Sequence, residues 1–401
     1  MSELSYLEKL LNGTEIELLP LSSLCELITT GKLNANAMED NGAYPFFTCN
    51  EEPYRINTYA FDLEAILISG NGSQVGHLNY YNGKFNAYQR TYILGEFNEN
   101  VDIMYLYYYL MHTLKHYIHK NSKKGSVPYI TMPMLENFTF PIPCPNTPEK
   151  SLAIQSEIVR VLDTFTALTA ELTDELTARK KQYSYYRDQL LSFNDGEVEY
   201  LPMGDKRVGE FIRGGTFQKK DFTDFGVGCI HYGQIYTYYG TYTNTTKTFI
   251  SESLARKCRK AESGNLIIAT TSENDDDVCK AVAWLGYDDI AVSSDACIYK
   301  HKLNPKYVSY FFQTECFQHQ KKQYITGAKV RRVNASNLAQ ILIPVPSPEE
   351  QARIVAILDK FDTLTSSITE GLPREIELRQ KQYEYYRDLL FSFPEPESVN
   401  N

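Results

Sequence analysis

The sequence predicts an α+β protein in which two globular α/β domains are joined by two long antiparallel helices, with a pseudo-twofold internal repeat. The main observation is a duplication: residues 181–193 and 381–393 are identical at ten of thirteen positions. Each copy ends a long heptad-like apolar pattern, which is typical of paired helices. The predicted boundaries are 1–147 for the first globular domain, 148–197 for the first helix, 198–346 for the second domain and 347–401 for the second helix.

Length and composition agree with this division. The chain has 401 residues, of which 43% are hydrophobic and 22% charged, values typical of a folded protein with two to four domains. We find no apolar run of the length that a membrane helix needs and no signal-peptide pattern, so we expect a cytoplasmic protein. The eight cysteines are scattered without a C-x-x-C pair, which predicts neither a disulfide framework nor a zinc site.

Shorter matches extend the repeat through both halves. Residues 158–165 match 354–361, and each is preceded by a Pro-x-Pro element, at Pro141/Pro143 and Pro344/Pro346. Three further pairs of segments correspond: 16–21 with 198–203, the expected buried strands 65–69 with 265–269, and the expected aromatic helices 103–119 with 307–325. A basic, glycine-containing loop follows each aromatic segment, at 123–126 and 326–329.

The two long helices are expected to pair along their apolar stripes. The second stripe has one additional four-residue step, which we interpret as a stutter that preserves the apolar face. Gly371 and Pro373 favour a kink or an interruption there. The alternative is that each helix packs only on its own domain. The predicted helix and subunit interface consists of Phe165, Leu168, Leu172, Leu176, Tyr183, Tyr186, Leu190, Phe361, Leu364, Ile368, Tyr383, Tyr386 and Leu390.

These elements resemble the specificity (S) subunit of Type I restriction–modification systems over nearly the whole chain. The most specific elements are the Pro-x-Pro exits, the Ile-Val-x-x-Leu-Asp-x-Phe helix starts and the Gln-Tyr-x-Tyr-Tyr-Arg-Asp-x-Leu helix ends. The first helix also contains Thr-Ala-Glu-Leu at 169–172, followed by Thr-Asp-Glu-Leu at 173–176. Some family members repeat Thr-Ala-Glu-Leu here; this chain departs by one residue in the second unit.

The resemblance implies a non-catalytic DNA-reading subunit without a cofactor of its own. Each target-recognition domain would read one half of a split target in double-stranded DNA, and the helices would set the gap between the halves. Two modification (M) subunits would bind the helical parts and methylate adenine N6 with S-adenosylmethionine. Restriction (R) subunits would add ATP-driven translocation and cleavage.

The formal net charge of −10 opposes DNA binding by the whole surface, but the charge is unevenly distributed. Residues 199–342 carry 19 Lys and Arg against 15 Asp and Glu, whereas residues 15–145 carry 8 against 13. Base reading needs polar and basic side chains on loops. The candidates are Asn71, Ser73, Gln74 and Arg90 in the first domain, and Lys219, Lys220, Gln234, Ser272 and Asn274 in the second. The expected phosphate contacts, at matching positions in both repeats, are Lys123, Lys124, Lys329, Arg331 and Arg332.

Other functions find less support in the sequence. A self-sufficient methyltransferase or nuclease is opposed by the lack of a Walker A sequence and of an Asn-Pro-Pro-Tyr or Asp-Pro-Pro-Tyr motif. The glycine-rich segment 69–73 fits a tight turn better than a nucleotide loop. His112, His116 and His119 share a helix face, and 275–277 is an acidic run, but neither has the further ligands that a metal site needs. A coiled-coil scaffold without DNA specificity, and the specificity subunit of a methylation-only system, stay open as alternatives.

Overall fold

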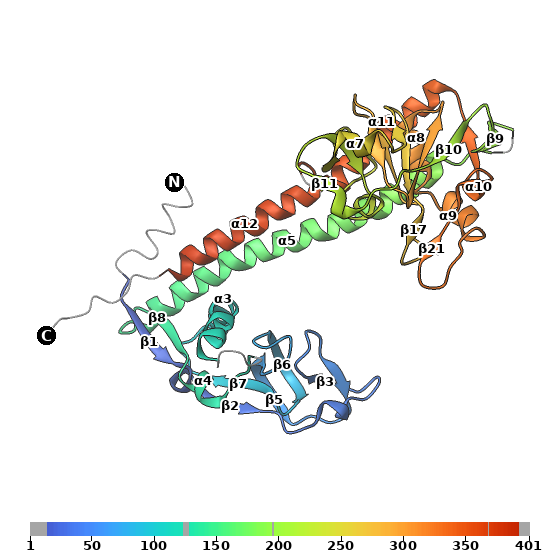
Figure 1. Cartoon of the computed structure of the whole chain (residues 1–401). Helices are drawn as coiled ribbons and strands as arrows, with labels where there is room; N and C mark the ends of the chain where they lie inside the picture. Colours follow the sequence, from blue (N-terminus) through green and yellow to red (C-terminus); the bar gives the residue numbers. More distant parts are fainter. Residues whose placement is uncertain (1–13, 123–127, 195, 368, 393–401) are drawn as a thin grey trace. The chain divides into compact units, whose positions relative to one another are not determined.

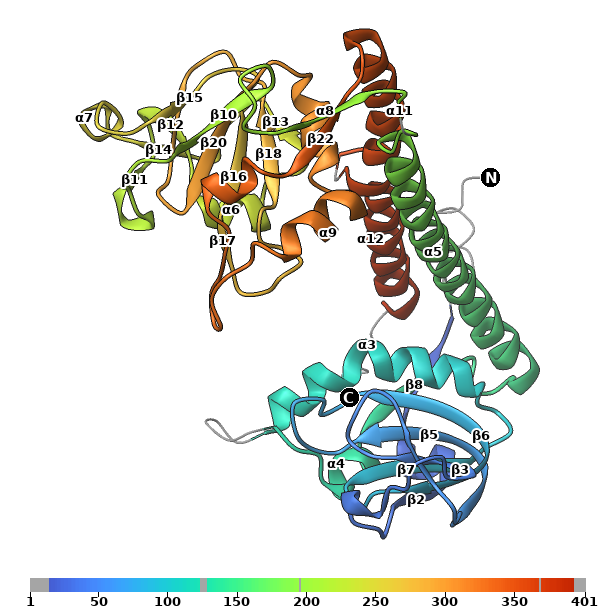
Figure 2. The ribbon, with the colours of Figure 1, turned by 90° about the vertical axis from the view of Figure 1, so that its right-hand side faces the viewer.

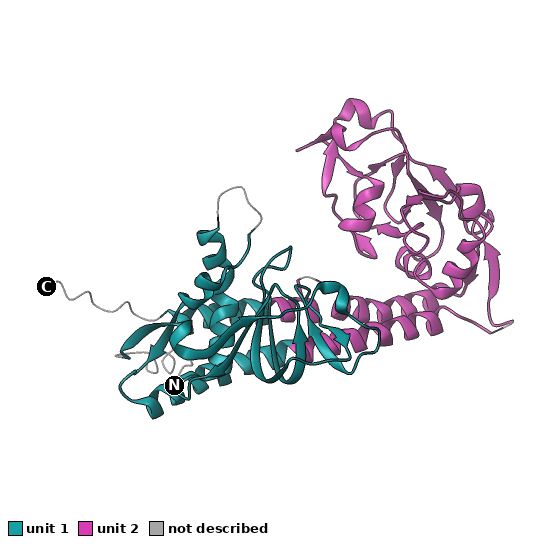
Figure 3. Ribbon diagram, turned by 90° about the horizontal axis from the view of Figure 1, so that it is seen from below, with its two compact units in different colours: residues 1–169, 378–401 teal, residues 170–377 magenta. Residues whose placement is uncertain are grey.

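The computed structural model describes residues 14–122, 128–194, 196–367 and 369–392 (Figure 1). The chain divides into two compact units (Figure 3). Unit 1 contains the chain up to Thr169 together with the chain from Leu378 onward, and unit 2 contains Ala170–Glu377. Each unit therefore combines one globular part with segments of both long helices, which is why the repeat is visible in the helices as well as in the domains.

Unit 1 is built on a six-stranded sheet with strand order β2-β7-β5-β6-β3-β4. Its apolar run 65–69 lies in the centre, where Ala65, Ile66 and Ile68 are completely buried. The elements of its globular part are β1 (Ile16–Pro20), α2 (Leu21–Leu24), β2 (Cys25–Thr30), η1 (Ala35–Ala37), β3 (Tyr44–Phe47), β4 (Tyr54–Ile56), β5 (Phe61–Ser69), β6 (Leu78–Ala87), β7 (Thr91–Phe97), α3 (Ile103–Asn121), α4 (Met132–Glu136) and β8 (Thr139–Pro143). Asp102 begins α3 because its carboxylate accepts hydrogen bonds from the amides of Met104 and Tyr105.

Unit 2 repeats this plan with additional strands. Its first sheet has the order β10-β20-β16-β18-β13 and its second the order β11-β14-β12-β19-β15. The strand elements are β9 (Glu199–Pro202), β10 (Gly209–Arg213), β11 (Phe222–Thr223), β12 (Val227–Ile230), β13 (Tyr242–Thr243), β14 (Thr248–Ile250), β15 (Lys260–Ala261), β16 (Leu266–Ala269), β17 (Thr271–Ser272), β18 (Ala281–Trp284), β19 (Ile290–Val292), β20 (Ala296–His301), β21 (Arg331–Arg332) and β22 (Leu342–Val345). The helical elements are η2 (Lys219–Asp221), α6 (Tyr232–Thr237), α7 (Glu252–Ala255), α8 (Pro305–Phe311), α9 (Glu315–Lys322) and α10 (Ala335–Leu338).

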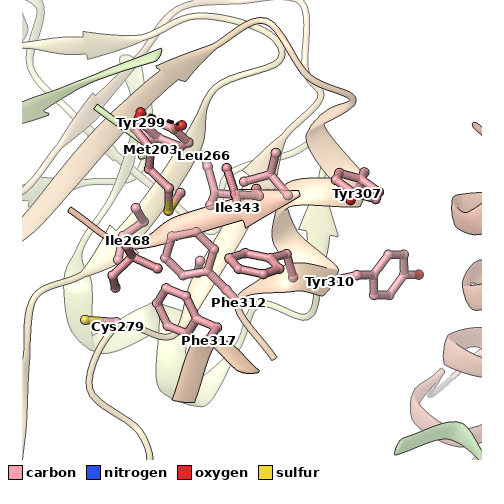
Figure 4. Close-up of a cluster of buried hydrophobic side chains, with 14 of the residues drawn as sticks. Met203, Leu266, Ile268, Cys279, Tyr299, Tyr307, Tyr310, Phe312, Phe317 and Ile343 are labelled. Carbon is pink, nitrogen blue, oxygen red and sulfur yellow. Dashed lines mark hydrogen bonds between the residues drawn. The ribbon is translucent and has the colours of Figure 1, made fainter. Parts of the chain in front are cut away.

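The strand pairings explain the weak sequence echoes between the halves. β1 pairs antiparallel with β8, which carries the first Pro-x-Pro element, and β9 pairs in the same way with β22, which leads into the second. β5 lies between β6 and β7, as β16 lies between β18 and β20. The buried cluster around Leu266, Tyr299 and Phe317 fills the space between the β10-β20-β16-β18-β13 sheet of unit 2 and its helices (Figure 4).

The aromatic segment of the second half is two helices rather than the single helix predicted over 307–325. α8 ends at Phe311 and α9 begins at Glu315. Thr314 has extended backbone angles, and its hydroxyl accepts a hydrogen bond from the amide of Phe317. This N-cap starts a new helix, so the first-half prediction of one helix is confirmed by α3 and the second is wrong.

The first long helix is continuous, whereas the second is interrupted. α5 (Pro148–Leu190) has 43 residues, which corresponds to about 64 Å at 1.5 Å per residue. The second consists of α11 (Pro348–Ser366) and α12 (Leu372–Phe391). Gly371 adopts a φ of 84°, and a Cβ there would lie 2.4 Å from the carbonyl oxygen of Thr363. The predicted interruption is confirmed, and the extra four-residue step falls at it, so a turn accommodates the step instead of a continuous stutter.

In both units the helices pack side by side. In unit 1 the rings of Phe165 on α5 and Tyr386 on α12 stack with centroids 5.2 Å apart. The two segments run in opposite directions beside α3 (Figures 1 and 2). In unit 2 the rings of Tyr183 and Tyr186 on α5 stack against Phe361 on α11. No helix in the described part of the chain is long and apolar enough to cross a membrane.

Candidate nucleic-acid interface

Three loops of unit 1 come together at the end of β5. The backbone amide of Gly70 donates to the carbonyl of Arg90 over 2.9 Å, which joins the loop after β5 to the loop before β7. The thiol of Cys49 donates to the side-chain oxygen of Asn71 over 3.2 Å, and the amide of Gln74 donates to Glu51 over 3.1 Å. The fold therefore brings the side chains of Asn71 and Gln74 close to the backbone of Arg90, although these residues come from separate loops.

The loop after β5 is the tight turn that its glycines predict. Gly72 has a φ of 83°, a left-handed conformation that favours glycine, and a Cβ at this position would face open space. Ser73 in the same turn is exposed, as is Arg90. Small and polar residues here leave the backbone accessible, which a loop that approaches a large ligand requires.

In unit 2 the corresponding loop pairs with a segment that lies much further along the chain. β17 pairs antiparallel with β21, so that Ser272 lies opposite Arg331. The amide of Val333 donates to the carbonyl of Thr270 over 3.1 Å, and the amide of Ile130 donates to the carbonyl of Gly70 over 2.9 Å in unit 1. Both bonds join the loop after the central strand to the segment that follows the basic loop. The matched position of the two basic loops, expected from the repeat, thus has a common structural basis.

The basic residues in and just before β21 are not equivalent. The guanidinium of Arg331 lies 2.8 Å from the carboxylate of Asp275 and donates to the carbonyl of Gly327 over 2.7 Å. Lys329 and Arg332 are exposed. Lys123 and Lys124, the predicted counterparts in the first domain, lie outside the described residues. Arg331 is therefore a positioned side chain, while Lys329 and Arg332 can move to meet a phosphate.

A buried lysine stabilises the acidic loop that follows β17. The ammonium group of Lys321 donates to the carbonyls of Asp276 and Val278 over 3.1 and 2.9 Å, and only 1% of the residue is exposed. Desolvation lowers the pKa of this group. Asn274 is fixed in the same loop, because its side chain donates to Asp277 and accepts from the Asp277 amide. The loop is thus ordered before any ligand binds.

Gln234 does not lie on this surface, contrary to the sequence-based expectation. It is 8% exposed, and its side-chain oxygen accepts from the amide of His231 over 2.9 Å. Its nitrogen donates to Thr248 over 3.0 Å. The residue closes the first turn of α6, so reading a base would leave buried backbone groups unpaired. Lys219 and Lys220 lie in η2 and are exposed, as expected.

The duplicated helix-start motif attaches each helix to its own globular part. The carboxylate of Asp163 accepts a hydrogen bond from the hydroxyl of Tyr108 on α3. At the matching position Asp359 accepts from the hydroxyl of Tyr310 over 2.8 Å and from Lys306 over 2.7 Å. The Leu-Asp pair of the motif is therefore a docking contact, in which each aspartate is hydrogen-bonded to a tyrosine of its own globular part.

Two further pairs of contacts follow the same plan. The hydroxyls of Tyr105 and Tyr307 donate to the carbonyls of Pro141 and Pro344 in the two Pro-x-Pro elements. Near the helix starts, the side-chain oxygens of two glutamines accept backbone bonds of 2.9 and 2.8 Å from the residues that cap α3 and α8; these are Gln155 with Asp102 and Gln351 with Asn304. Sequence reasoning missed these roles, although equal spacing in the two repeats was a usable signal.

The helix-end motif binds the other globular part. Asp188 at the end of α5 accepts from the amide of Glu315, the first residue of α9, over 2.9 Å. Asp388 near the end of α12 lies 3.7 Å from the ring of His112 on α3, and Phe391 stacks on the same ring. Each globular part thus holds the start of the helix that follows it and the end of the other helix.

A model of the Type I restriction modification DNA specificity domain matches the chain twice, over residues 14–179 and 202–378. The chain belongs to this Type I DNA specificity family. It is 38% identical, over the full length of both chains, to the specificity subunit of the Escherichia coli Type I restriction enzyme EcoR124I/EcoR124II. It is 30% identical to a putative specificity subunit of Haemophilus influenzae, over 97% of this chain and 98% of that protein.

Solved structures show the same fold. The crystal structure of a Type I restriction–modification S subunit from M. genitalium matches with a TM-score of 0.54 at 14% identity, covering 96% of this chain and 98% of that one. A chain from a study of complex assembly and conformational transition in the Type I system matches with a TM-score of 0.63 at 11% identity, covering 94% and 97%. The fold class predicted from the repeat, two mixed α/β parts with long paired helices, is confirmed.

The specificity-family helices are buried less evenly than the apolar stripe predicts. Tyr386 and Leu390 of α12 are buried, and so is Tyr183 of α5. Tyr186, which the repeat predicts to match Tyr386, is 42% exposed.

The remaining predicted interface residues follow a simple division. Three leucines in the middle of α5 are only half-buried, as are five further members of the predicted set, and one member lies outside the described residues. These are Leu168, Leu172 and Leu176, then Phe165, Leu190, Leu364 and Tyr383, with Phe361 also half-buried, and finally Ile368. Side chains of α5 that are half-buried in this chain are available to contact another subunit.

This difference gives a test at matched positions of the family repeat. We expect Tyr386→Ala to lower the free energy of unfolding of unit 1 by about 3–5 kcal/mol, because a buried aromatic ring leaves a cavity. Tyr186→Ala should cost about 1 kcal/mol, since it removes one exposed stacking contact with Phe361. Denaturant unfolding of the two variants measures both costs, and equal losses would contradict the burial pattern.

Within the described residues, no group of three or more His, Cys, Asp or Glu side chains could hold a metal ion. His112 stacks on Phe391, and desolvation lowers its pKa, with Arg387 contributing in the same direction. The acidic run 275–277 is occupied by Arg331, Asn274 and the backbone contact to Lys321. Both segments that could suggest metal binding therefore have structural partners in this specificity-family fold.

Proposed function

We propose that this chain is the sequence-specific DNA-recognition subunit of a Type I restriction–modification complex. Each globular part reads one half of a bipartite target in double-stranded DNA. The observation that carries the proposal is the shared loop frame, in which the Gly70–Ile130 and Thr270–Val333 bonds hold equivalent loops in both units. The frame is the same, but the side chains on it differ, and different side chains on one frame suit the reading of two different half-sites.

The proposed reading residues of unit 1 are the polar side chains gathered at the end of β5, namely Asn71, Ser73, Gln74 and Arg90. In unit 2 they are Ser272 and Asn274 on the loop after β17, while the exposed Lys219 and Lys220 on η2 are proposed to contact the DNA backbone. Lys123, Lys124, Lys329, Arg331 and Arg332 are proposed to contact phosphates. Phosphate contacts position the protein on the duplex, and base contacts give it sequence preference.

The partners are proposed from the family. Two modification subunits that bind S-adenosylmethionine would dock on the helical parts and methylate adenine N6, and restriction subunits would use ATP. The half-buried leucines of α5 and the exposed Tyr185 and Tyr385, 61% and 53% exposed, are suitable contact residues for them. We further propose the cytoplasm as the site of action, and 1–147, 148–197, 198–346 and 347–401 as the functional divisions of the chain.

Mapping N6-methyladenine across the host genome, with and without this gene, tests the proposal. We expect methylation to disappear at one split motif and to return when the gene is restored. The purified chain with its modification subunit should then prefer a duplex carrying that motif over random duplex by about 10³-fold or more. An unchanged methylation map, or equal binding to both duplexes, would contradict a recognition role and favour a scaffold.

A further inference from the structure

The two units share a core, but unit 2 carries two insertions in it. In unit 1, β3 pairs with β6 in parallel and with β4 antiparallel, and in unit 2 β12 pairs in the same way with β19 and β14. Between β4 and β5 unit 1 has the short turn 57–60, whereas between β14 and β16 unit 2 has residues 251–265, in which β15 (Lys260–Ala261) pairs with β19 as the start of β5 pairs with β6. The first insertion lies earlier in the chain. Between β12 and β14 unit 2 has residues 231–247, which include α6, whereas unit 1 has only residues 48–53 between β3 and β4.

The second insertion is strongly basic. After α7 it carries four exposed basic residues in a span of five positions: Arg256, Lys257, Arg259 and Lys260. Arg256 lies 3.7 Å from Glu252, with both side chains more than three-quarters exposed, so this pair does little to neutralise it. Like charges concentrated on a surface repel one another and so destabilise the fold. The same concentration attracts polyanions, and binding of DNA phosphates is its most direct function.

Lys219 and Lys220 extend the same surface. A Cβ at Gly215 would lie 2.8 Å from the Cα of Cys258, which places the segment leading to η2 directly against the insertion. Phe217 and Ala255 are buried in one cluster, with Cys258 packed against it. The basic side chains that follow and precede these buried residues therefore emerge from two adjacent segments. Among the nearby acids, Asp221 is engaged with the amide of Gln218 over 2.8 Å.

The described part of unit 1 has no counterpart of this surface. In both units a 3-10 turn follows an isolated parallel bridge, between Leu33 and Tyr88 in one and between Gly215 and Ser293 in the other. The turn contains Ala35 and Asn36 in unit 1 where unit 2 has Lys219 and Lys220. The four basic residues of the insertion have no equivalent in the turn 57–60, whose sequence is Asn-Thr-Tyr-Ala.

The basic surface is separate from the strand pair of β17 and β21. α6 lies between them: the rings of Phe217 and Phe222, on either side of η2, lie 6.4 and 5.9 Å from the ring of His231 at the start of α6, and the hydroxyl of Tyr236 donates to the carbonyl of Thr271 over 2.7 Å. Six helical residues span about 9 Å, which corresponds to about three base pairs at 3.4 Å each. In both Figure 1 and Figure 2, α7 lies apart from β17 within unit 2.

We propose that Lys219, Lys220, Arg256, Lys257, Arg259 and Lys260 form a phosphate-binding surface that holds duplex DNA flanking the half-site read by unit 2. The surface reads no bases. It makes unit 2 the main source of the salt-dependent affinity of the chain. This inference rests on the proposed function, because it presupposes that the strand pair of β17 and β21 faces DNA.

The test measures the affinity of the full-length chain for a random-sequence duplex as a function of salt. Each lost phosphate contact reduces the slope of log K against log[salt] by about 0.9. Changing the four basic residues of the insertion to Gln should therefore reduce the slope by up to about 3.6, and Lys219→Gln with Lys220→Gln by up to about 1.8. The matched control changes four exposed lysines elsewhere, Lys150, Lys180, Lys181 and Lys206, and should leave the slope nearly unchanged.

Two further measurements make the inference specific. Ala35→Lys with Asn36→Lys should steepen the slope by up to about 1.8, by giving unit 1 the charges of η2. Removing the base pairs that flank the unit 2 half-site should weaken binding of the original chain. It should not weaken binding of the variant in which the four basic residues of the insertion are changed to Gln. The methylated motif should be the same for every variant.

The possible outcomes separate cleanly. An unchanged slope in the fourfold variant, or a reduction equal to that of the control, overturns the inference while leaving the proposed function intact. Loss of modification-subunit binding with an unchanged slope would identify the surface as a protein-docking site instead. If the original chain and its modification subunit bind no duplex at all, the proposed function itself fails. Unchanged melting temperatures establish that the exposed substitutions leave the fold intact.

Discussion

Exchanging residues 15–140 for the corresponding domain of another specificity-family member is expected to change one half of the methylated motif and leave the other half unchanged. All three loops at the end of β5 lie within this segment, whereas the strand pair of β17 and β21 lies outside it. Each wrong base pair typically costs about 1–3 kcal/mol, so an exchanged half-site should abolish methylation of the original motif. Methylome sequencing of the exchange strain measures the result.

The docking contacts determine whether such an exchange folds correctly. The exchanged domain must supply hydroxyls that match Tyr105 and Tyr108, because these reach Pro141 and Asp163 at the junction with α5. A narrower exchange that replaces only 25–97 keeps α3 and its contacts, and it still transfers the loops. We expect both exchanges to alter the same half-site.

Controls distinguish a specificity change from a loss of assembly. A variant with Tyr108→Phe in the original domain should keep the original motif and lose only stability, because it removes one docking hydrogen bond and no loop residue. If an exchange changes both half-sites, the assignment of one half-site to each unit is wrong. If Tyr108→Phe changes the motif, the docking contact contributes to recognition.

The sequence was sufficient for the helices because their constraints are local and repeated. The pattern of apolar residues in 158–190 fixes one face of a helix, and the same face returns in 354–390. Gly371 marked the interruption through its backbone preference, and the structure places the turn there. In these segments propensity, periodicity and duplication all favour the same structure.

The candidate site was harder to predict because its geometry depends on contacts between distant segments. Gln234 is polar and follows a strand, as a base-reading residue would, but its amide is used to close α6. Lys321 belongs to a basic cluster in the sequence, yet it is buried and holds the loop at Asp276. Composition cannot distinguish a polar side chain that faces solvent from one that satisfies a buried backbone group.

The insertions of unit 2 were hidden for a related reason. The repeat aligns the ends of each half, but it does not show where the additional residues of the second half lie. The strand pairing places most of 251–265 where unit 1 has only a short turn, and only then does the basic segment at 256–260 become a feature of one unit.

Inserting Thr-Ala-Glu-Leu after Leu172 is expected to keep both half-sites and to widen the spacer between them by one base pair. The insertion point lies within the continuous helix α5. Four residues lengthen a helix by about 6 Å and advance its face by about 400°, a net turn of about 40°. One added base pair rotates the far half-site by about 34–36°, and two would require about twice that rotation. The rotation therefore selects one base pair, although the length alone would permit two.

The second helix needs no matching insertion, because its hydrogen-bond ladder is already interrupted between Ser366 and Leu372. A three-residue insertion of Thr-Ala-Glu at the same point is the matched control. It advances the helix face by about 300°, so the apolar stripe beyond it turns by about 60° in the opposite direction. Phe165 would keep its contact with Tyr386, while Tyr183 would rotate away from Phe361. We expect the four-residue variant to methylate the widened motif and the three-residue variant to lose methylation. An unchanged spacer in the first, or a changed half-site in either, would show that α5 does not set the spacing.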